Sequence, residues 1–290
     1  MSKKNQKNKT KKKRNILFWI FATIFIGGIL GMVYYIYAIN KENEAFKDVK
    51  KLMIEEDTDV QAQEEIKKNG LDYYIIDGEV VQKQFKDLYL ANSDIIGWVQ
   101  VDGTAIDYPV MYTPTDEQYY IHKDFDKNYS FGGCIFAAAG TDIKAPSNNI
   151  ISYGHHMANH SMYRDIDYYE KEDYYKEHKF IKFDTLRQTG TYEVIAAFRT
   201  KIVSDKKDGF MYYAYINNGK PEFEEYVKKA KELTPYDIPT TAEYGDQLIT
   251  LSTCAYHTYN GRFVVVAKRI DGAEVNLKKK PIETITTKSE

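Results

Sequence analysis

The stretch that decides the fold runs Gln247-Leu-Ile-Thr-Leu-Ser-Thr-Cys254, then Ala255-Tyr-His-Thr-Tyr-Asn-Gly261, then Arg262-Phe-Val-Val-Val-Ala267. Two β-rich runs joined by a short polar loop indicate an antiparallel pair of strands. In that pairing the last residue of the first strand lies beside the first residue of the second. The sequence therefore predicts that the thiol of Cys254 and the guanidinium of Arg262 face each other at one end of a sheet.

A second polar cluster ends an apolar run about a hundred residues earlier, in Asn149-Ile-Ile-Ser-Tyr-Gly-His155-His156. A thiol, an imidazole and a guanidinium supply the nucleophile, the proton-transfer partner and the oxyanion charge that thiol acyl transfer requires. We therefore hypothesise that Cys254, His155 and Arg262 form one catalytic set.

Each of these residues also has a plainer interpretation. A lone cysteine in a strand is most often a small buried hydrophobe, a histidine can be structural, and a single arginine is usually a surface charge. Cys134 fits the plainer interpretation, since it lies in the apolar run Phe131-Gly-Gly-Cys-Ile-Phe-Ala137 without a charged neighbour. Cys254 differs because polar residues follow it at once, and only the three residues together favour catalysis.

The first forty residues predict a membrane anchor. Residues 1–14 contain seven Lys, one Arg and no acid, and residues 15–40 carry no charge. This mainly apolar stretch matches the ~20 residues needed to span a bilayer, and its bulky end differs from the cleavage site of a signal peptide. The positive-inside rule then predicts a single-pass protein of the cell membrane, with a cytoplasmic N-terminus and an extracellular catalytic domain.

The basic tail also changes how the charge of the chain is interpreted. The 290 residues have a net charge of −2, but without the eight basic residues of the tail 32 basic residues stand against 42 acidic ones, a net charge of −10. An acidic external part gives little electrostatic support to nucleic-acid binding. We therefore expect no nucleic-acid partner.

The remaining chain combines many short strands with few helices. Strands are predicted over 97–101, 104–111, 134–138, 149–153, 180–183, 191–203, 247–253 and 262–270, and helices over 41–68, 80–90, 113–121 and 221–233, with a turn-bounded segment at 72–78. Such a pattern favours a mainly β protein with a closed or nearly closed barrel. The helix over 221–233 is inserted before the Cys-bearing strand.

The predicted organisation has five parts. They are a basic cytoplasmic tail (1–14), a transmembrane signal anchor (15–40), a helical stalk or N-terminal extension (41–79), a catalytic domain (80–275) and a flexible tail (276–290). The helix over 41–68 could serve as a stalk or pack on the domain.

Two segments carry a resemblance to a known family. Thr250-Leu-Ser-Thr-Cys254 with Arg262, and Tyr153-Gly-His-His-Met157, resemble the two active-site signatures of sortases, the membrane-anchored cysteine transpeptidases of Gram-positive bacteria. The form of both signatures and the helix-bearing insertion are similar to class B. The similarity spans about Val80 to Ile270 and implies an eight-stranded sortase-type β-barrel with N-terminal helices.

The resemblance also implies a role for each matching residue. Cys254 would be the nucleophile, His155 the general acid/base, and Arg262 the residue that holds the substrate carbonyl and the oxyanion. Ser252 and Thr253 would bind substrate in the groove for the sorting signal. We further expect residues 204–246 to form one wall of that groove, because ligand sites tend to lie on loops held by a rigid scaffold.

The implied reaction consists of two acyl transfers. The thiol cleaves a cell-wall sorting signal of the Asn-Pro-x-Thr or Ser/Pro-Pro-x-Thr type after Thr and forms a thioester, which an amine of a peptidoglycan precursor, cross-bridge or stem peptide then resolves. The expected partners are a surface protein with that signal, the peptidoglycan amine and the membrane. No metal or organic cofactor is required.

Three alternatives remain open at this point. The chain could be a secreted cysteine endopeptidase that releases the acyl group to water, or a non-enzymatic wall-binding module in which Cys254 is inert. A zinc hydrolase built on His155, His156 and His160 is disfavoured, because the spacing lacks the His-Glu-x-x-His arrangement and adjacent histidines on a strand point to opposite faces.

Overall fold

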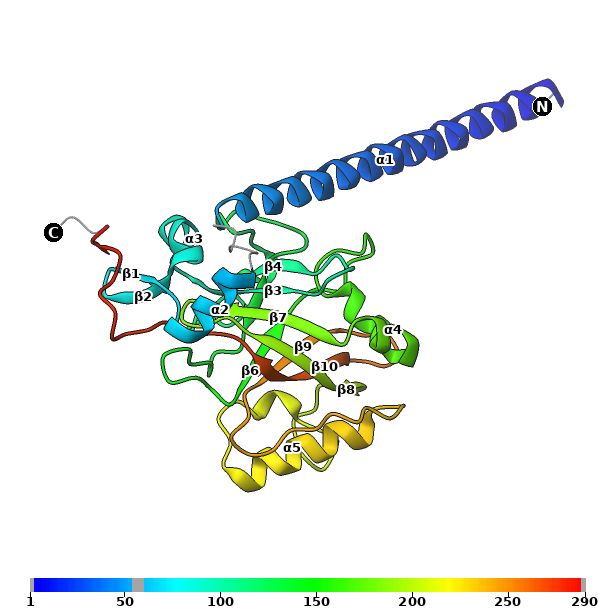
Figure 1. The fold of residues 1–290 in the computed structure, drawn as a ribbon. Coiled ribbons are helices and arrows are strands. Elements are labelled where there is room, and N and C mark those ends of the chain that lie inside the picture. Colours follow the sequence, from blue (N-terminus) through cyan, green and yellow to red (C-terminus); the bar gives the residue numbers. More distant parts are fainter. Residues whose placement is uncertain (1–2, 54–59, 288–290) are drawn as a thin grey trace. The chain divides into compact units, whose positions relative to one another are not determined.

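The computed structural model describes residues 3–53 and 60–287, and eight of its strands form one closed barrel (Figure 1). The barrel strands are β3 (Ile95–Gln100), β4 (Asp107–Met111), β5 (Ile135–Ala137), β6 (Asn149–Tyr153), β7 (Phe180–Thr185), β8 (Thr191–Lys201), β9 (Leu248–Cys254) and β10 (Gly261–Asp271). Around the barrel they follow the order β10-β8-β7-β3-β4-β5-β6-β9. The predicted mainly β fold with an eight-stranded barrel is confirmed.

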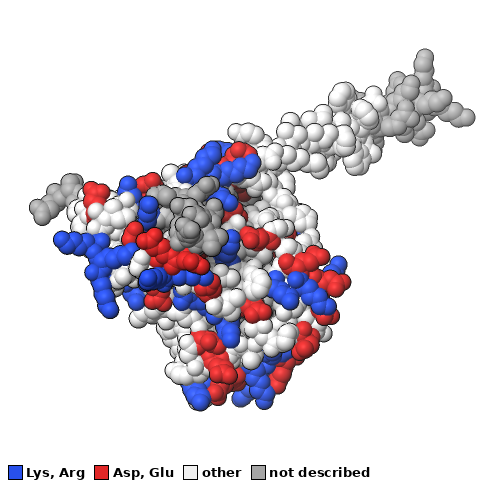
Figure 2. All heavy atoms as spheres, in the orientation of Figure 1, with Lys and Arg blue, Asp and Glu red and all other residues white. Residues whose placement is uncertain are grey.

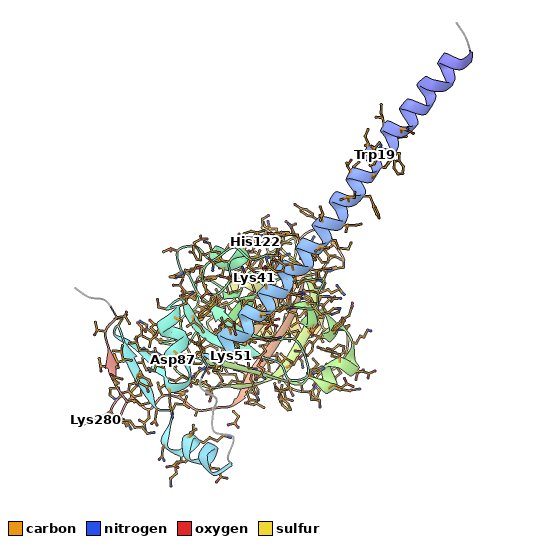
Figure 3. All side chains as sticks on the ribbon, turned by 90° about the horizontal axis from the view of Figure 1, so that it is seen from above. Trp19, Lys41, Lys51, Asp87, His122 and Lys280 are labelled. Atoms are coloured by element: carbon orange, nitrogen blue, oxygen red, sulfur yellow. The ribbon has the colours of Figure 1, made fainter. Side chains whose placement is uncertain are left out.

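The chain divides into two units, one up to Ala45 and one from Phe46 onward. The first unit is part of the long helix α1 (Lys3–Lys51). Its large apolar side chains between Ile16 and Tyr37 are exposed, for example Trp19 at 66% (Figure 3), whereas Ile39 is buried. The part of this helix from Asn15 onward is long and apolar enough to cross a membrane.

The last turns of α1 belong to the second unit and pack on the barrel. Phe46 and Val49 are buried in the main core, and the Phe46 ring meets the ring of Tyr108 edge-on at 5.2 Å. Lys50 forms an ion pair with Asp107 on the same strand, β4. The predicted helix over 41–68 could be a stalk or pack on the domain. Its residues 46–51 pack on the domain. The next helix is α2 (Val60–Asn69), and residues 54–59 of the predicted helix lie outside the described residues.

The alternation of residue types along β9 follows from its two faces. Ile249 and Leu251 point into the main core, to which all eight barrel strands contribute. Thr250 and Ser252 point the other way, because successive side chains of a strand face opposite sides. The hydroxyl of Tyr226 lies 2.6 Å from the Thr250 hydroxyl, and the hydroxyl of Tyr212 lies 2.6 Å from the Ser252 hydroxyl.

Those tyrosines come from the predicted insertion before β9. Helix α5 (Lys220–Leu233) confirms the predicted helix over 221–233, and it buries Phe223, Tyr226, Val227 and Ala230. This spacing of three and four residues places them on one face of the helix. They form a second apolar cluster with residues of β8, β9 and β10, so α5 covers the outer face of these strands (Figure 1).

A small second sheet refines one prediction and corrects two. Strands β1 (Tyr73–Ile76), β2 (Glu79–Gln82) and β11 (Thr284–Ile285) lie in the order β11-β1-β2. The segment 72–78 is therefore a strand followed by the turn residues Asp77 and Gly78, both with positive φ. The helix predicted over 80–90 is wrong at its start, where Val80 and Val81 pair with β1. Residues 284–285, expected in a flexible tail, pair in parallel with β1.

The short helices lie mainly in the connections. They are η1 (Lys83–Phe85), α3 (Lys86–Ala91), η2 (Tyr119–His122), η3 (Arg164–Glu170), α4 (Glu172–Glu177) and η4 (Tyr212–Ala214). The helix predicted over 113–121 is reduced to η2, because the hydroxyl of Thr113 donates to the carbonyl of Asp116 and closes a turn. Acidic and basic side chains are interspersed over the face of the second unit that Figure 2 shows.

Candidate active site

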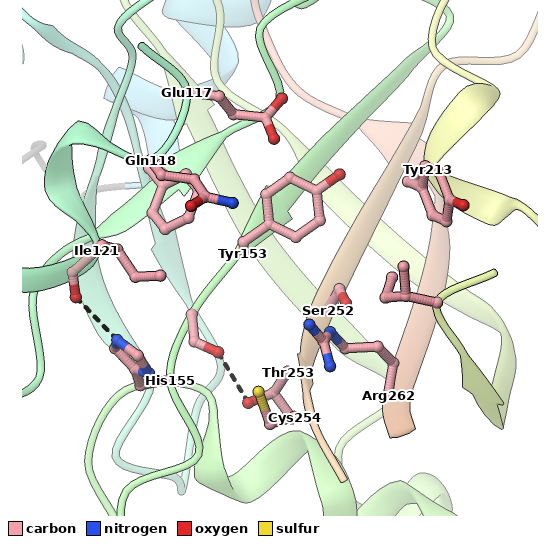
Figure 4. Close-up of a pocket in the computed structure, with 13 residues that line it drawn as sticks. Glu117, Gln118, Ile121, Tyr153, His155, Tyr213, Ser252, Thr253, Cys254 and Arg262 are labelled. Atoms are coloured by element: carbon pink, nitrogen blue, oxygen red, sulfur yellow. Dashed lines mark hydrogen bonds between the residues drawn. The ribbon is translucent and has the colours of Figure 1, made fainter. Parts of the chain in front are cut away.

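Three strand ends meet at one edge of the barrel. Cys254 on β9 is the direct antiparallel partner of Arg262 on β10, as the sequence predicts. β6 runs parallel to β9 with Tyr153 beside Ser252, so these two strands end at the same edge of the barrel. The ends are tied together, because the Thr253 hydroxyl donates to the carbonyl of Gly154 over 2.8 Å, one residue before His155 (Figure 4).

His155, Cys254 and Arg262 all line one pocket of about 290 Å³ (Figure 4). The remaining lining residues are Glu117, Gln118, Ile121, Phe136, Tyr153, Gly154, Ile202, Tyr213, Ser252 and Thr253. Glu117 and Gln118 lie at the end away from Cys254, with the ring of Tyr153 between. The pocket thus extends from the thiol as a partly apolar cleft.

The ring of His155 is oriented by a backbone carbonyl. Its Nε2 lies 2.8 Å from the carbonyl oxygen of Ile121, and because a carbonyl only accepts, Nε2 carries a proton and donates. In the neutral ring the lone pair is therefore on Nδ1, which is turned away from Ile121 and can take up or return a proton.

Burial lowers the pKa of His155 below its ordinary value. The bond to the Ile121 carbonyl favours the protonated ring and opposes this shift, whereas the neighbouring His122 adds to it. Near neutral pH the imidazole of His155 is accordingly mostly uncharged, and its protonated form is the minor one.

The two cysteines differ as the sequence predicts. Cys254 is only partly buried and opens on the pocket. Cys134 is fully buried, and loss of hydration raises the pKa of its thiol well above the ordinary value. A thiolate is the reactive form of cysteine, so Cys134 is suited to packing and Cys254 to chemistry.

The guanidinium of Arg262 lies beside Cys254 and Ser252 in Figure 4. Its Nη1 donates to the carbonyl of Gly261 over 2.9 Å, which fixes the plane of the group. Within residues 3–53 and 60–287 its other N–H groups make no hydrogen bond, so they remain able to bind an oxygen in the pocket.

The two residues predicted to bind substrate line the pocket, but their hydroxyls have partners in the protein. Ser252 is 1% exposed and its Oγ lies 2.6 Å from the hydroxyl of Tyr212. Burial raises the pKa of Tyr212 to about 12, so this phenol stays protonated and can donate. Thr253 binds Gly154 as described. Both hydroxyls thereby shape the pocket wall.

His156, the second residue of the doublet, does not line this pocket. Its Nε2 lies 3.6 Å from Asp167, and the ring of Tyr256 meets its ring edge-on at 5.3 Å. Burial, followed by the charge of Arg164, lowers its pKa. His160 in turn stacks on Tyr168. In the described part of the chain no group of three or more His, Cys, Asp or Glu residues is placed to hold a metal ion.

Several lining residues were not foreseen from the sequence. Glu117, Gln118 and Ile121 come from the segment between β4 and β5, which no local pattern connects with Cys254. Of residues 204–246, expected to form one wall, only Tyr213 lines the pocket within the described structure. Helix α5 packs instead on the outer face of the barrel. The long insertion therefore supports β9 more than it borders the cleft.

Comparisons with known proteins agree with this fold. The sortase domain family matches residues 99–270. Sortase B of Staphylococcus aureus is 31% identical over 194 residues, which cover 66% of this chain and 77% of the relative. A solved S. aureus sortase B–substrate complex is 30% identical with a TM-score of 0.59, over 66% of this chain and 86% of that one. Sortase B from B. anthracis in complex with AAEK1 is 25% identical with a TM-score of 0.64, over 81% and 99% of the respective chains.

The barrel, the strand-end site and the family match over more than half of the sequence show that the chain belongs to the sortase family of cysteine transpeptidases. Within that family it is of class B, as its two signatures predict and its relatives bear out.

Proposed function

We propose that this sortase cleaves a cell-wall sorting signal after a Thr residue and transfers the surface protein to an amine of peptidoglycan. In this proposal Cys254 is the nucleophile, His155 the general acid/base, and Arg262 the cation that stabilises the oxyanion. The observation that carries it is the convergence of these three side chains on one pocket, from strand ends that are adjacent in the barrel.

The first half-reaction forms the acyl-enzyme. The thiolate of Cys254 attacks the carbonyl carbon of Thr in the signal, and the carbonyl oxygen gains negative charge beside the Arg262 guanidinium. When this intermediate collapses, the peptide C–N bond breaks and protonated His155 gives its proton to the departing amine. The product is a thioester, and Nδ1 of His155 is left with its lone pair.

The second half-reaction reverses these roles. The acceptor amine attacks the thioester carbonyl, again with the oxygen beside Arg262, and passes a proton to His155. The C–S bond then breaks, which restores the thiolate and leaves an amide between the surface protein and peptidoglycan. A pocket that limits access of water favours the amine over hydrolysis.

The cleft beyond Cys254 supports a peptide substrate. It is lined by aromatic and aliphatic side chains, and its far end carries the polar groups of Glu117 and Gln118. The related S. aureus enzyme was solved as a complex with substrate. We assign this cleft to the sorting signal, of the Asn-Pro-x-Thr or Ser/Pro-Pro-x-Thr type.

The apolar helix supports attachment to the cell membrane. We infer a single-pass anchor with the basic residues 1–14 in the cytoplasm and the barrel outside, because basic residues flanking a span favour the cytoplasmic side. A tag at the C-terminus should then be cleaved when protease is added to intact protoplasts. Protection of that tag until lysis would overturn this orientation.

The reaction itself is tested with the full-length chain in detergent, a sorting peptide and added triglycine. We expect a covalent thioester on the tryptic peptide that contains Cys254, and an amide product whose mass includes triglycine. Cys254→Ala should abolish both, whereas the matched variant Cys134→Ala should retain both. Release of the peptide to water alone, at any triglycine concentration, would instead identify an endopeptidase.

A further inference from the structure

The short helix η2 contacts His155 in two ways. The carbonyl of Ile121 binds Nε2, and the ring of the next residue, His122, stacks on the His155 ring with centroids 5.3 Å apart and planes 18° apart. One element therefore holds the imidazole at its edge and covers one of its faces.

The segment that follows η2 holds this element in place. The backbone N–H of Ser130 donates to the carbonyl of His122 over 3.1 Å. Gly133 has a φ of +59°, and a side chain there would come within 2.4 Å of two carbonyl oxygens of η2, one of them that of Ile121. Only glycine permits so close an approach. The positions of the Ile121 carbonyl and of the His122 backbone are thus fixed by the neighbouring segment.

We propose that His122 is a positioning residue for His155. Its ring shields one face of the imidazole from water and restricts its rotation, and its positive charge, when present, opposes a second positive charge on His155. This inference rests on the proposed role of His155 as general acid/base.

The two effects differ in size. Burial is the largest cause of the lowered pKa of His155, and the charge of His122 is a smaller one. His122 is itself exposed, so water and salt screen its charge. The ring of His122 is one part of the surroundings that bury His155, and its screened charge adds to the lowering of the pKa.

Other titratable groups also surround His155. Those that line the same pocket are Glu117, Tyr153, Cys254 and Arg262, the chain neighbour His156 lies near Asp167 and Arg164, and the ring of Tyr129 lies 6.2 Å from that of His122. A substitution at position 122 removes none of these groups. A change in the pKa of His155 in such a variant therefore reports on His122.

The test compares His122→Gln with His122→Phe in the full-length chain in detergent. With ¹³C-labelled histidine, NMR titration gives the pKa of His155 directly, assigned by the signal lost in His155→Ala. We expect His122→Gln, which removes both the stacked ring and its charge, to raise the pKa of His155. His122→Phe keeps a stacked ring without the charge and should raise this pKa less. The acid limb of the pH profile of peptide cleavage should move in the same direction, while KM stays unchanged because His122 does not line the pocket.

The matched control is His160→Gln, which removes another exposed histidine stacked on an aromatic ring. It should leave the pKa of His155 and the acid limb in place. An unchanged pKa in His122→Gln, or an equal rise in His122→Phe, would overturn the inference. Failure of the proposed function can be told apart from failure of this inference. It would appear as an active His155→Ala variant, whatever the NMR titration of His155 shows.

Discussion

Arg262 and Cys254 are cross-strand partners, so the distance from thiol to guanidinium is set by the register of β9 and β10. We predict that Arg262→Ala lowers kcat about 10²–10³-fold, as loss of an oxyanion donor does. Arg262→Lys should restore little, because a lysine has no planar fork of donors. Steady-state kinetics with a fluorogenic sorting peptide measure both, and full activity of Arg262→Ala would remove this residue from the mechanism.

The lowered pKa of His155 fixes the acid side of the pH profile. The proposed reaction needs protonated His155 together with the thiolate of Cys254. As pH falls below the pKa of His155, that residue is already protonated and thiolate is lost, so the rate declines there. We therefore expect an acid limb in kcat/KM below the ordinary value of 6.5, with both limbs belonging to the coupled pair. An acid limb at or above 6.5 would contradict the burial of His155.

Thr253 links the two strand ends that carry Cys254 and His155. Thr253→Val keeps the shape of the side chain but removes the donor to Gly154. It should cost about 0.5–1.5 kcal/mol of unfolding free energy and lower kcat, because only the backbone bond from Gly154 to the Ser252 carbonyl then holds the residue before His155 to β9. Thr253→Ser, which retains the hydroxyl, is the control and should behave like the natural chain in thermal melts and kinetics. A loss in Thr253→Ser together with an unaffected Thr253→Val would show that the methyl group matters instead of the hydroxyl.

The sequence predicts the site residues best where they are close in the chain. Cys254 and Arg262 are joined by a short loop, so their pairing follows from local pattern alone. His155 required a second strand end and the resemblance to sortases. Ile121 and Glu117 could not be foreseen, because their contacts depend on how the connection from β4 to β5 folds over the barrel edge.

At the scale of elements, α5 and η4 act on β9 through buried hydroxyls. Tyr226 lies 2.6 Å from Thr250, which in turn donates to Asn149 of β6 over 2.9 Å. Tyr226→Phe leaves the Thr250 hydroxyl with one partner fewer in a fully buried site. We predict a loss of about 1–3 kcal/mol, seen as a lower midpoint in denaturant. Tyr244→Phe, at an exposed ring, should cost nothing measurable.

Element prediction succeeded and failed for physical reasons. The strands of the barrel alternate or run apolar over five residues or more, so their pattern is local. Val80 and Val81 do have a local strand signal that the helix prediction overlooks, because Asp77-Gly78 is a two-residue hairpin turn between two β-rich runs. Thr284 and Ile285 read as a free tail because they pair with β1, over two hundred residues away. A pairing over that distance in the chain is decided by tertiary contacts and leaves little local trace.

At the scale of the whole molecule, the barrel unit includes the end of helix α1. A fragment beginning at Lys41 keeps Phe46 and Val49 in the core, whereas one beginning at Val60 loses them. We expect the first fragment to be soluble and active and the second to be less stable by about 1.5–3 kcal/mol for each lost side chain. Calorimetry of the two fragments, with Phe46→Ala in the longer one as control, measures this. Equal melting temperatures would show that the helix end is dispensable.

The place of β9 between β6 and β10 has a consequence for how the enzyme matures. β9 and β10 are the last two barrel strands in the chain, and the parallel pairing of β6 with β9 spans about a hundred residues. Contacts of such long range form late in folding. During synthesis the thiol therefore meets its histidine only when nearly the whole polypeptide is available and the barrel closes. An unfinished chain has not yet brought Cys254 and His155 to one pocket, so under the proposed function it performs no acyl transfer before β9 and β10 are in place.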